Sequence, residues 1–144
     1  MTADEVRENP GVIRRIVGEG HGIGVLCSED PAAEYQETAD LIFEAARVNT
    51  VLIAAALPEF DKACTSAAEE NGLVFWNYEI DGVQGGAGLS SAASITAFLS
   101  FYTERADLRI QCSDATDEAI TAVLYYINNN NYILRSVCEV GSLA

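Results

Sequence analysis

Five short segments with strand character, some continuously apolar and others alternating with polar residues, recur along this chain, and a segment with helical character separates each from the next. Strands that alternate with helices form βαβ units, whose right-handed crossovers bring the strands together in a parallel sheet. The chain length is typical of one such domain. The predicted strands cover residues 23–27, 50–57, 73–80, 107–112 and 132–140.

The predicted fold class is therefore α/β. We expect a single domain over residues 1–144, a three-layer sandwich with a mostly parallel five-stranded sheet of the flavodoxin-like or Rossmann-like kind. Residues 1–20 form a short N-terminal helix and a glycine-rich lead-in that precede the sheet. Proline lacks the amide hydrogen that a helix interior uses, so Pro10 predicts a break in this helix near Asn9–Gly11.

Capping signals set the bounds of the later helices. Asp30 offers a side-chain acceptor to the first helical turn, and Pro31 suits the first helical position. Asn71-Gly72 is typical of a helix end. The predicted helices cover residues 31–47, 58–71, 90–104 and 115–128, with a strand over 95–103 as the alternative to the third helix.

The charge balance excludes two classes of partner. Acidic residues number 22 against 8 basic ones, which gives a formal net charge of −14. Nucleic-acid readers and binders of anionic membranes need clustered lysine and arginine, so neither partner is expected. Lys62 is the only lysine. A carboxylate excess almost without lysine favours adaptation to high salt, where screening weakens repulsion, although an ordinary acidic protein is the alternative.

The first residues, Met1 to Glu5, lack the basic region and apolar stretch of a secretory signal. We therefore expect a cytoplasmic protein, or a virion protein if the chain is viral.

The cysteines predict neither a metal site nor another cofactor. Cys27, Cys64, Cys112 and Cys138 are widely spaced, and His21 is the single histidine, whereas zinc ligands usually come in close pairs. Cys27 and Cys112 each end a predicted strand just before a helix, whose dipole lowers a thiol pKa. A cysteine nucleophile is thus one hypothesis, and buried, unreactive thiols are the simpler interpretation.

Polar residues and glycines gather where the predicted strands end. Open α/β sheets bind ligands beyond the carboxyl ends of their strands. The loop 82–88 follows a strand and precedes a helix, as a phosphate cradle would, but it lacks the spacing and the lysine of known phosphate-binding motifs. We predict no catalytic residue, and a ligand of unknown chemistry. The candidate ligand-binding residues are Ser28, Asp81, Gly85, Gly86, Gly88, Ser90, Ser113 and Asp114.

The aromatic residues predict an interface between copies of the chain. Tyr125 and Tyr126 are adjacent in a predicted helix, so both cannot point inward equally, and Trp76 and Tyr78 share one face of a predicted strand. Aromatic side chains that do not fit a single core often anchor interfaces. These four residues are the candidate interface residues of a homo-oligomer.

Together these features favour a non-catalytic, homo-oligomerising assembly or interaction protein adapted to high salt. A tail component of a halophile virus is one form that this function would take. The first alternative is a small flavodoxin-like or receiver-like domain that binds a ligand or regulates a partner through loop 82–88. The second alternative is a cysteine-dependent enzyme.

Overall fold

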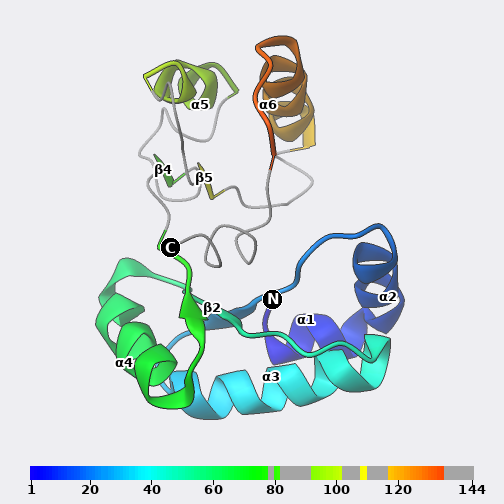
Figure 1. The fold of residues 1–144 in the computed structure, drawn as a ribbon, viewed down its shortest axis with the longest axis vertical. Coiled ribbons are helices and arrows are strands. Elements are labelled where there is room, and N and C mark those ends of the chain that lie inside the picture. The colour runs from blue at the N-terminus through cyan, green and yellow to red at the C-terminus, as the bar shows by residue number, and fades with distance from the viewer. Residues whose placement is uncertain (78–79, 82–91, 102–107, 110–116, 135–144) are drawn as a thin grey trace. The chain divides into compact units, whose positions relative to one another are not determined.

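The computed structural model describes residues 1–77, 80–81, 92–101, 108–109 and 117–134 (Figure 1). The described residues form two compact units, the first within Met1–Trp76 and the second within Asn77–Leu134. The single domain expected over residues 1–144 stays a prediction.

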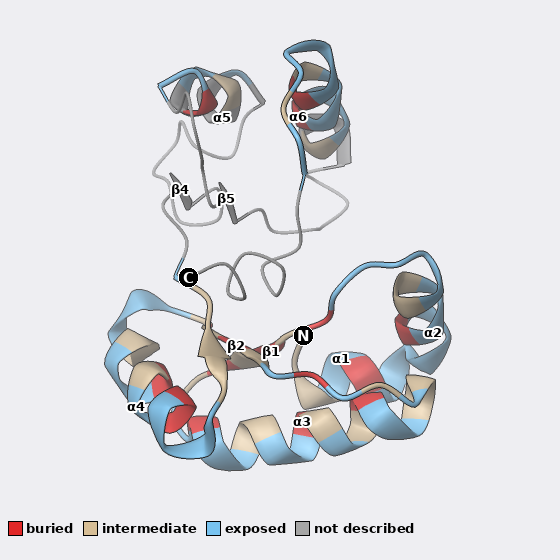
Figure 2. Cartoon of the chain, in the orientation of Figure 1, coloured by how far each residue is buried: buried red, intermediate tan, exposed pale blue. Residues whose placement is uncertain are grey.

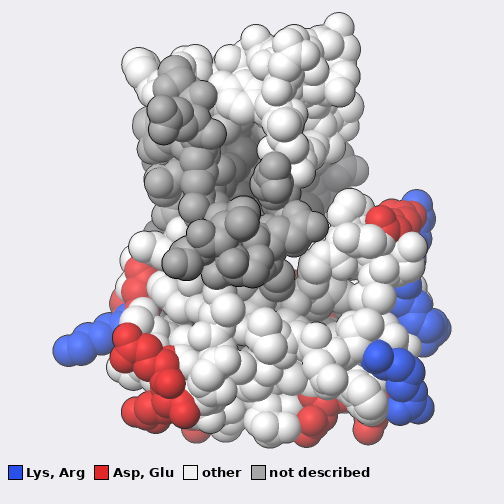
Figure 3. All heavy atoms as spheres, viewed as in Figure 1, with Lys and Arg blue, Asp and Glu red and all other residues white. Residues whose placement is uncertain are grey.

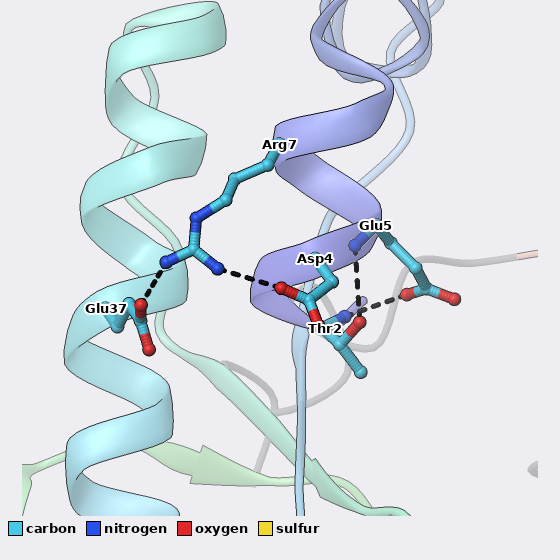
Figure 4. A network of polar contacts seen from close by, with 5 residues as sticks. All are labelled: Thr2, Asp4, Glu5, Arg7 and Glu37. Atoms are coloured by element: carbon cyan, nitrogen blue, oxygen red, sulfur yellow. Dashed lines mark hydrogen bonds and ion pairs between the residues drawn. The ribbon is translucent and has the colours of Figure 1, made fainter.

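The first unit begins with two short helices, α1 (Ala3–Glu8) and α2 (Pro10–Gly18). Pro10 is the first residue of α2, so the predicted break is confirmed. Thr2 and Glu5 form a capping box at the start of α1. The Thr2 amide donates to the Glu5 carboxylate at 2.8 Å, and the Glu5 amide donates to the Thr2 hydroxyl at 3.4 Å (Figure 4). These contacts satisfy two amides that a helix start leaves unpaired.

Arg7 links α1 to the next helix. Its guanidinium pairs with Asp4 at 2.9 Å and also with Glu37 of α3 (Pro31–Ala46) (Figure 4). The hydrogen bond with Glu37 is the main cause that raises the pKa of Arg7. Because the pairs lie at the surface, they orient α1 against α3 more than they stabilise the fold.

The first unit contains a parallel three-stranded sheet in the order β1-β2-β3. The strands are β1 (Val25–Cys27), β2 (Leu52–Ala55) and β3 (Val74–Phe75). Val25 pairs with Ile53, which in turn pairs with Phe75, so these three side chains share one face. A Cβ on Gly24 would lie 2.9 Å from Leu52 Cδ2, so glycine permits the close approach of these two segments.

The α/β class and the parallel sheet are confirmed, but the single five-stranded sheet is wrong for the described residues. There β4 (Ile80–Asp81) and β5 (Leu108–Arg109) pair in parallel as a separate two-stranded sheet. The predicted strand 73–80 is divided between β3 and β4, and Trp76 and Asn77 belong to neither. An apolar run allows a strand, but pairing partners decide how far that strand extends.

Helices α3 and α4 cover the sheet of the first unit, with α3 packed on β1 and α4 (Asp61–Asn71) packed on β2 and β3. Asp30 caps α3 as predicted, because its side chain accepts a hydrogen bond from the Ala33 amide at 3.2 Å. Gly72 ends α4 as predicted, in the left-handed conformation with φ 65°. Helix α3 ends at Ala46, with Arg47 as its cap, one residue before the end of the predicted helix at residue 47.

One buried cluster joins these elements (Figure 2). Alternate residues of β1 and β2 point into it, so Val25, Cys27, Ile53 and Ala55 are buried while their neighbours are half-buried. The helices contribute Val6, Ile13, Ile42, Cys64 and Ala68. The inward-facing side chains of the strands, which are every second residue, therefore pack against the apolar faces of four helices.

In the second unit, α5 (Ala92–Leu99) packs against α6 (Asp117–Asn129). The helix predicted at 90–104, rather than the alternative strand, is confirmed for residues 92–99, whereas residues 90–91 and 102–104 are outside the described residues. Leu99, Val123 and Ile127 are buried, and the Tyr132 hydroxyl donates to the Leu99 carbonyl oxygen at 3.1 Å. Residues 132–134 lie outside any strand, and the rest of the predicted strand 132–140 is outside the described residues.

Candidate functional site

The carboxyl ends of β1, β2 and β3 lie at one edge of the sheet, because the strands are parallel. Ser28, Glu29 and Asp30 follow β1, and Ala56 and Leu57 follow β2. The Ala56 amide donates to the Cys27 carbonyl oxygen at 2.7 Å, which holds the two segments together beyond the last paired residues. We call residues 28–30 and 56–57 the carboxyl edge.

A carboxylate from α3 organises the segment that follows β1. Glu34 accepts hydrogen bonds from the Ser28 amide at 2.6 Å and from the Ser28 hydroxyl at 2.7 Å. The Asp30 amide donates to the same carboxylate at 3.3 Å. The Glu34 carboxylate therefore occupies the cradle of backbone amides that an external anion would otherwise bind. The candidate residue Ser28 is fixed in place by this contact.

The same contacts set the charge of Glu34. Burial alone raises the pKa of this carboxyl, but the hydrogen bonds from the Ser28 side chain and from the backbone of residues 28–30 outweigh it. The net effect is a lowered pKa, so Glu34 is ionised at neutral pH. The backbone of residues 28–30 is therefore held by a negatively charged carboxylate.

The exposed groups of the carboxyl edge are carboxylates and an apolar side chain. Glu29 and Asp30 are exposed, and Asp30 already serves as the cap of α3. Leu57 is 42% exposed. Carboxylates accept hydrogen bonds from hydroxyl and amide donors, and an exposed leucine contacts the apolar face of a ligand. This set favours a ligand rich in hydroxyl groups over an anion.

The charged surface agrees with that preference. Figure 3 shows acidic side chains on both sides of the first unit, with basic side chains beside some of them. On the face drawn, the basic side chains gather mainly along the right-hand side of the first unit, with acidic side chains beside them. The net charge of the whole chain, −14, disfavours an anionic ligand.

Cys27 does not have the properties of a nucleophile. Its side chain is fully buried, and its thiol lies 3.6 Å from the Pro31 carbonyl oxygen. Burial is the main cause that raises the pKa of Cys27, to about 12. A reactive cysteine needs an accessible thiolate, so the hypothesis of a Cys27 nucleophile is wrong. Cys112, the other candidate, is outside the described residues.

We expect the folded protein to protect Cys27 and Cys64 from iodoacetamide at pH 8, because both thiols are buried and burial raises both pKa values. Peptide mapping by mass spectrometry measures the labelling of each cysteine. The same residues in urea are the control and label fully. Rapid labelling of Cys27 in the folded protein would contradict the burial described above.

The other predicted site residues do not join Ser28 within the described structure. Asp81 belongs to β4 in the second unit. Trp76 follows β3 and is half-buried, and Tyr125 is 70% exposed on α6. Tyr126 packs against Tyr132, with ring centroids 6.2 Å apart, so the two adjacent tyrosines do differ in exposure. Outside the described residues are Tyr78, Gly85, Gly86, Gly88, Ser90, Ser113 and Asp114.

Sequence reasoning missed Glu34. The available signal was a glutamate in the first turn of a helix that begins at Asp30-Pro31, where the helix dipole favours an anion. Within the described ranges, no three histidine, cysteine, aspartate or glutamate side chains come close enough to hold a metal ion. The predicted absence of metal and cofactor stays a prediction.

No family model and no curated protein matches the sequence. Solved structures match in fold. A polysaccharide deacetylase from Bacillus cereus is 18% identical, with a TM-score of 0.67 over 91% of this chain and 73% of that one. The catalytic domain of a peptidoglycan N-acetylglucosamine deacetylase from Eubacterium rectale is 8% identical, with a TM-score of 0.70 over 91% and 71%. This chain has the polysaccharide-deacetylase fold.

The fold also includes a protein described as a pseudoenzyme. The CE4 family pseudoenzyme of Bacillus anthracis is 14% identical, with a TM-score of 0.71 over 93% of this chain and 51% of that one. A mutant described as a CE4 pseudoenzyme with restored enzymatic activity has the same TM-score and identity. The fold alone therefore does not decide between catalysis and binding.

The fold likeness corrects the function expected from the sequence. The neighbours are carbohydrate-active proteins, so the interpretation as a non-catalytic structural or assembly protein adapted to high salt is wrong. Net charge informs solubility and association rather than fold, which explains why the acidic composition misled the interpretation. In the described part of the chain, no helix has the length and apolar character needed to cross a membrane. The expected cytoplasmic location stays a prediction.

Proposed function

We propose that this chain recognises N-acetylated polysaccharide at its carboxyl edge. The observation that carries this proposal is the fold likeness to polysaccharide and peptidoglycan deacetylases over 91% of the chain. Folds host many functions, so the likeness supplies the ligand class and the site residues supply the chemistry. Ligands of parallel α/β sheets bind beyond the carboxyl ends of the strands, where Glu29 and Leu57 are exposed.

Glu29 is the main polar contact in this proposal. Its carboxylate accepts hydrogen bonds from sugar hydroxyls or from an acetamide N–H, and these charge-assisted bonds are the strong ones. Glu34 holds the backbone of residues 28–30 in one conformation. Less conformational entropy of this backbone is therefore lost when Glu29 binds a ligand. Leu57 contacts the apolar C–H face of the same sugar.

Deacetylation is the second candidate function, because the enzymes that share the fold are deacetylases. Acetamide hydrolysis requires a general base for water and a group that stabilises the oxyanion. Glu29 supplies a carboxylate for the first role, but the Ser28 amide, the Ser28 hydroxyl and the Asp30 amide, which would serve the second, already donate to Glu34. Recognition is therefore the function that the described site supports best.

The test is titration with the tetramer of N-acetylglucosamine by calorimetry, with acetate release measured on the same mixtures. We expect saturable binding to the wild type without acetate release. Glu29→Gln is expected to weaken binding about tenfold, the effect of losing a hydrogen bond to a charged group. Glu44→Gln, an exposed glutamate on α3 away from the carboxyl edge, is the matched control and should bind as the wild type does.

The outcomes separate the two candidates. Acetate release that disappears in Glu29→Gln would assign deacetylation. The absence of both binding and release in the wild type would refute a glycan function, and equal binding by both variants would place the ligand elsewhere than beside Glu29.

A further inference from the structure

We propose that a groove at the opposite edge of the first unit is a second sugar-binding site, beyond the carboxyl edge of the proposed function. The groove has a volume of about 480 Å³, which lies within the range of about 300–1,000 Å³ typical of ligand sites. Helix α3 forms one wall, the segment that enters β2 forms the second, and the end of α4 forms the third. This is the amino end of β2 and β3, whereas Glu29 lies at the carboxyl end of β1.

The walls of the groove are fixed by internal hydrogen bonds. The Tyr35 hydroxyl donates to the Thr50 carbonyl oxygen at 2.6 Å, which ties α3 to the segment before β2. The Thr50 hydroxyl donates in turn to the Ile23 carbonyl oxygen. On the third wall, the Asn71 side-chain amide donates to the Ala67 carbonyl oxygen at 2.8 Å. The groove is therefore formed before any ligand binds, which lowers the entropy cost of binding.

The lining combines aromatic surface with hydrogen-bonding groups. Phe43 is 40% exposed, and the half-buried ring of Tyr35 lies on the same helix. Gln36, Asp40 and Asn49 are exposed at the groove, and Gln36 donates to Asp40 at 3.0 Å. A sugar ring presents an apolar C–H face and a rim of hydroxyl groups, so it matches both parts of this lining.

Charge narrows the ligand class further. Asp40 is the one charged residue of the lining, so phosphate or sulfate would meet a like charge inside the groove. A purely apolar segment of a protein partner would bury Gln36, Asp40 and Asn49 without compensation, which costs free energy. The ligand that fits is an uncharged sugar of one or two rings.

The central contact is the ring of Phe43. The Arg47 guanidinium lies 5.5 Å from the ring centroid, so a cation–π contact restrains the ring from one side. Because Phe43 is partly exposed, its removal leaves the buried cluster intact. Phe43→Ala is thus a variant that folds and loses the aromatic surface of the groove.

The test is titration of the ¹⁵N-labelled chain with the disaccharide of N-acetylglucosamine, followed by amide chemical shifts. We expect saturable shifts in the residues that line the groove, which are 35–36, 39–40, 43, 49–51 and 71–73. Phe43→Ala and Asp40→Asn should each weaken the affinity measured from these shifts at least about fivefold, as expected for the loss of one good contact. Val12→Ala on α2, at a position 48% exposed outside the groove, is the control and should leave them unchanged.

This test is separable from that of the proposed function. Glu29→Gln should leave the groove shifts intact, and Phe43→Ala should leave any shifts of residues 28–30 intact. The proposal fails if the chemical shifts of the groove amides do not change up to the solubility limit of the disaccharide. It also fails if the Phe43→Ala variant binds the disaccharide with the affinity of the wild type. Either result leaves recognition at the carboxyl edge untouched.

Discussion

Replacement of Ile13 by alanine is expected to lower the free energy of unfolding by about 2–5 kcal/mol. Ile13 is fully buried in α2 and belongs to the same cluster as Ile42 of α3 and the inward residues of β1 and β2. Removing its side chain loses the transfer free energy of three carbons and leaves a cavity that the surrounding strands and helices fill only in part. Alanine is a better helix former than isoleucine, so the loss comes from packing and not from a weaker helix.

Urea unfolding followed by circular dichroism measures this effect. Val12→Ala is the matched control, because Val12 is adjacent in the same helix, is also β-branched and is 48% exposed. The control should stay within about 0.5 kcal/mol of the wild type. Equal losses in the two variants would show that α2 does not pack on the cluster as described.

Local signals predicted the helices of this chain well. Pro10, Asp30-Pro31 and Asn71-Gly72 each act through the backbone within one turn, and the structure has a helix start or end at each of them. Strand pairing depends on residues far apart in sequence. The run 73–80 is rich in aromatic and β-branched residues, yet among its described residues only Val74 and Phe75 pair with β2, so its composition did not predict the length of the strand.

The candidate site was predictable only in part, for the same reason. The rule for parallel sheets led to Ser28, but the cradle around Glu34 depends on how residues 28–30 fold over α3. The groove near Phe43 is built from three separate segments, so no run of sequence marks it. The proposed glycan function rests on the likeness in fold, which composition and charge do not encode.

Glu34→Gln is expected to lower the free energy of unfolding by about 1–3 kcal/mol at pH 7, because hydrogen bonds to a charged acceptor become bonds to a neutral one. The amide also brings a donor toward the amides of Ser28 and Asp30, which are themselves donors. The variant keeps the size of the side chain, so the loss reports the charge in the cradle.

The pH dependence follows from the lowered pKa of Glu34. The ordinary pKa is 4.5, and the folded value lies below it because hydrogen bonds from the Ser28 side chain and from the backbone of residues 28–30 outweigh burial. As the pH falls below 4.5, the unfolded chain binds a proton first, so the contribution of Glu34 declines and is gone below the folded pKa. The stability difference between wild type and Glu34→Gln should therefore be full at pH 7 and shrink as the pH falls below 4.5 toward the lower folded pKa.

Urea unfolding at a series of pH values measures that difference directly. Subtracting the variant from the wild type removes the titration of other acidic groups, such as Glu19, whose pKa is also lowered by its pairing with Arg15. Glu44→Gln, on the exposed face of the same helix, should give a difference near zero at every pH. If the stability difference between wild type and Glu34→Gln stayed constant down to pH 2, the charge of Glu34 would not be what holds residues 28–30. The conformation of the backbone next to Glu29 would then not depend on that charge.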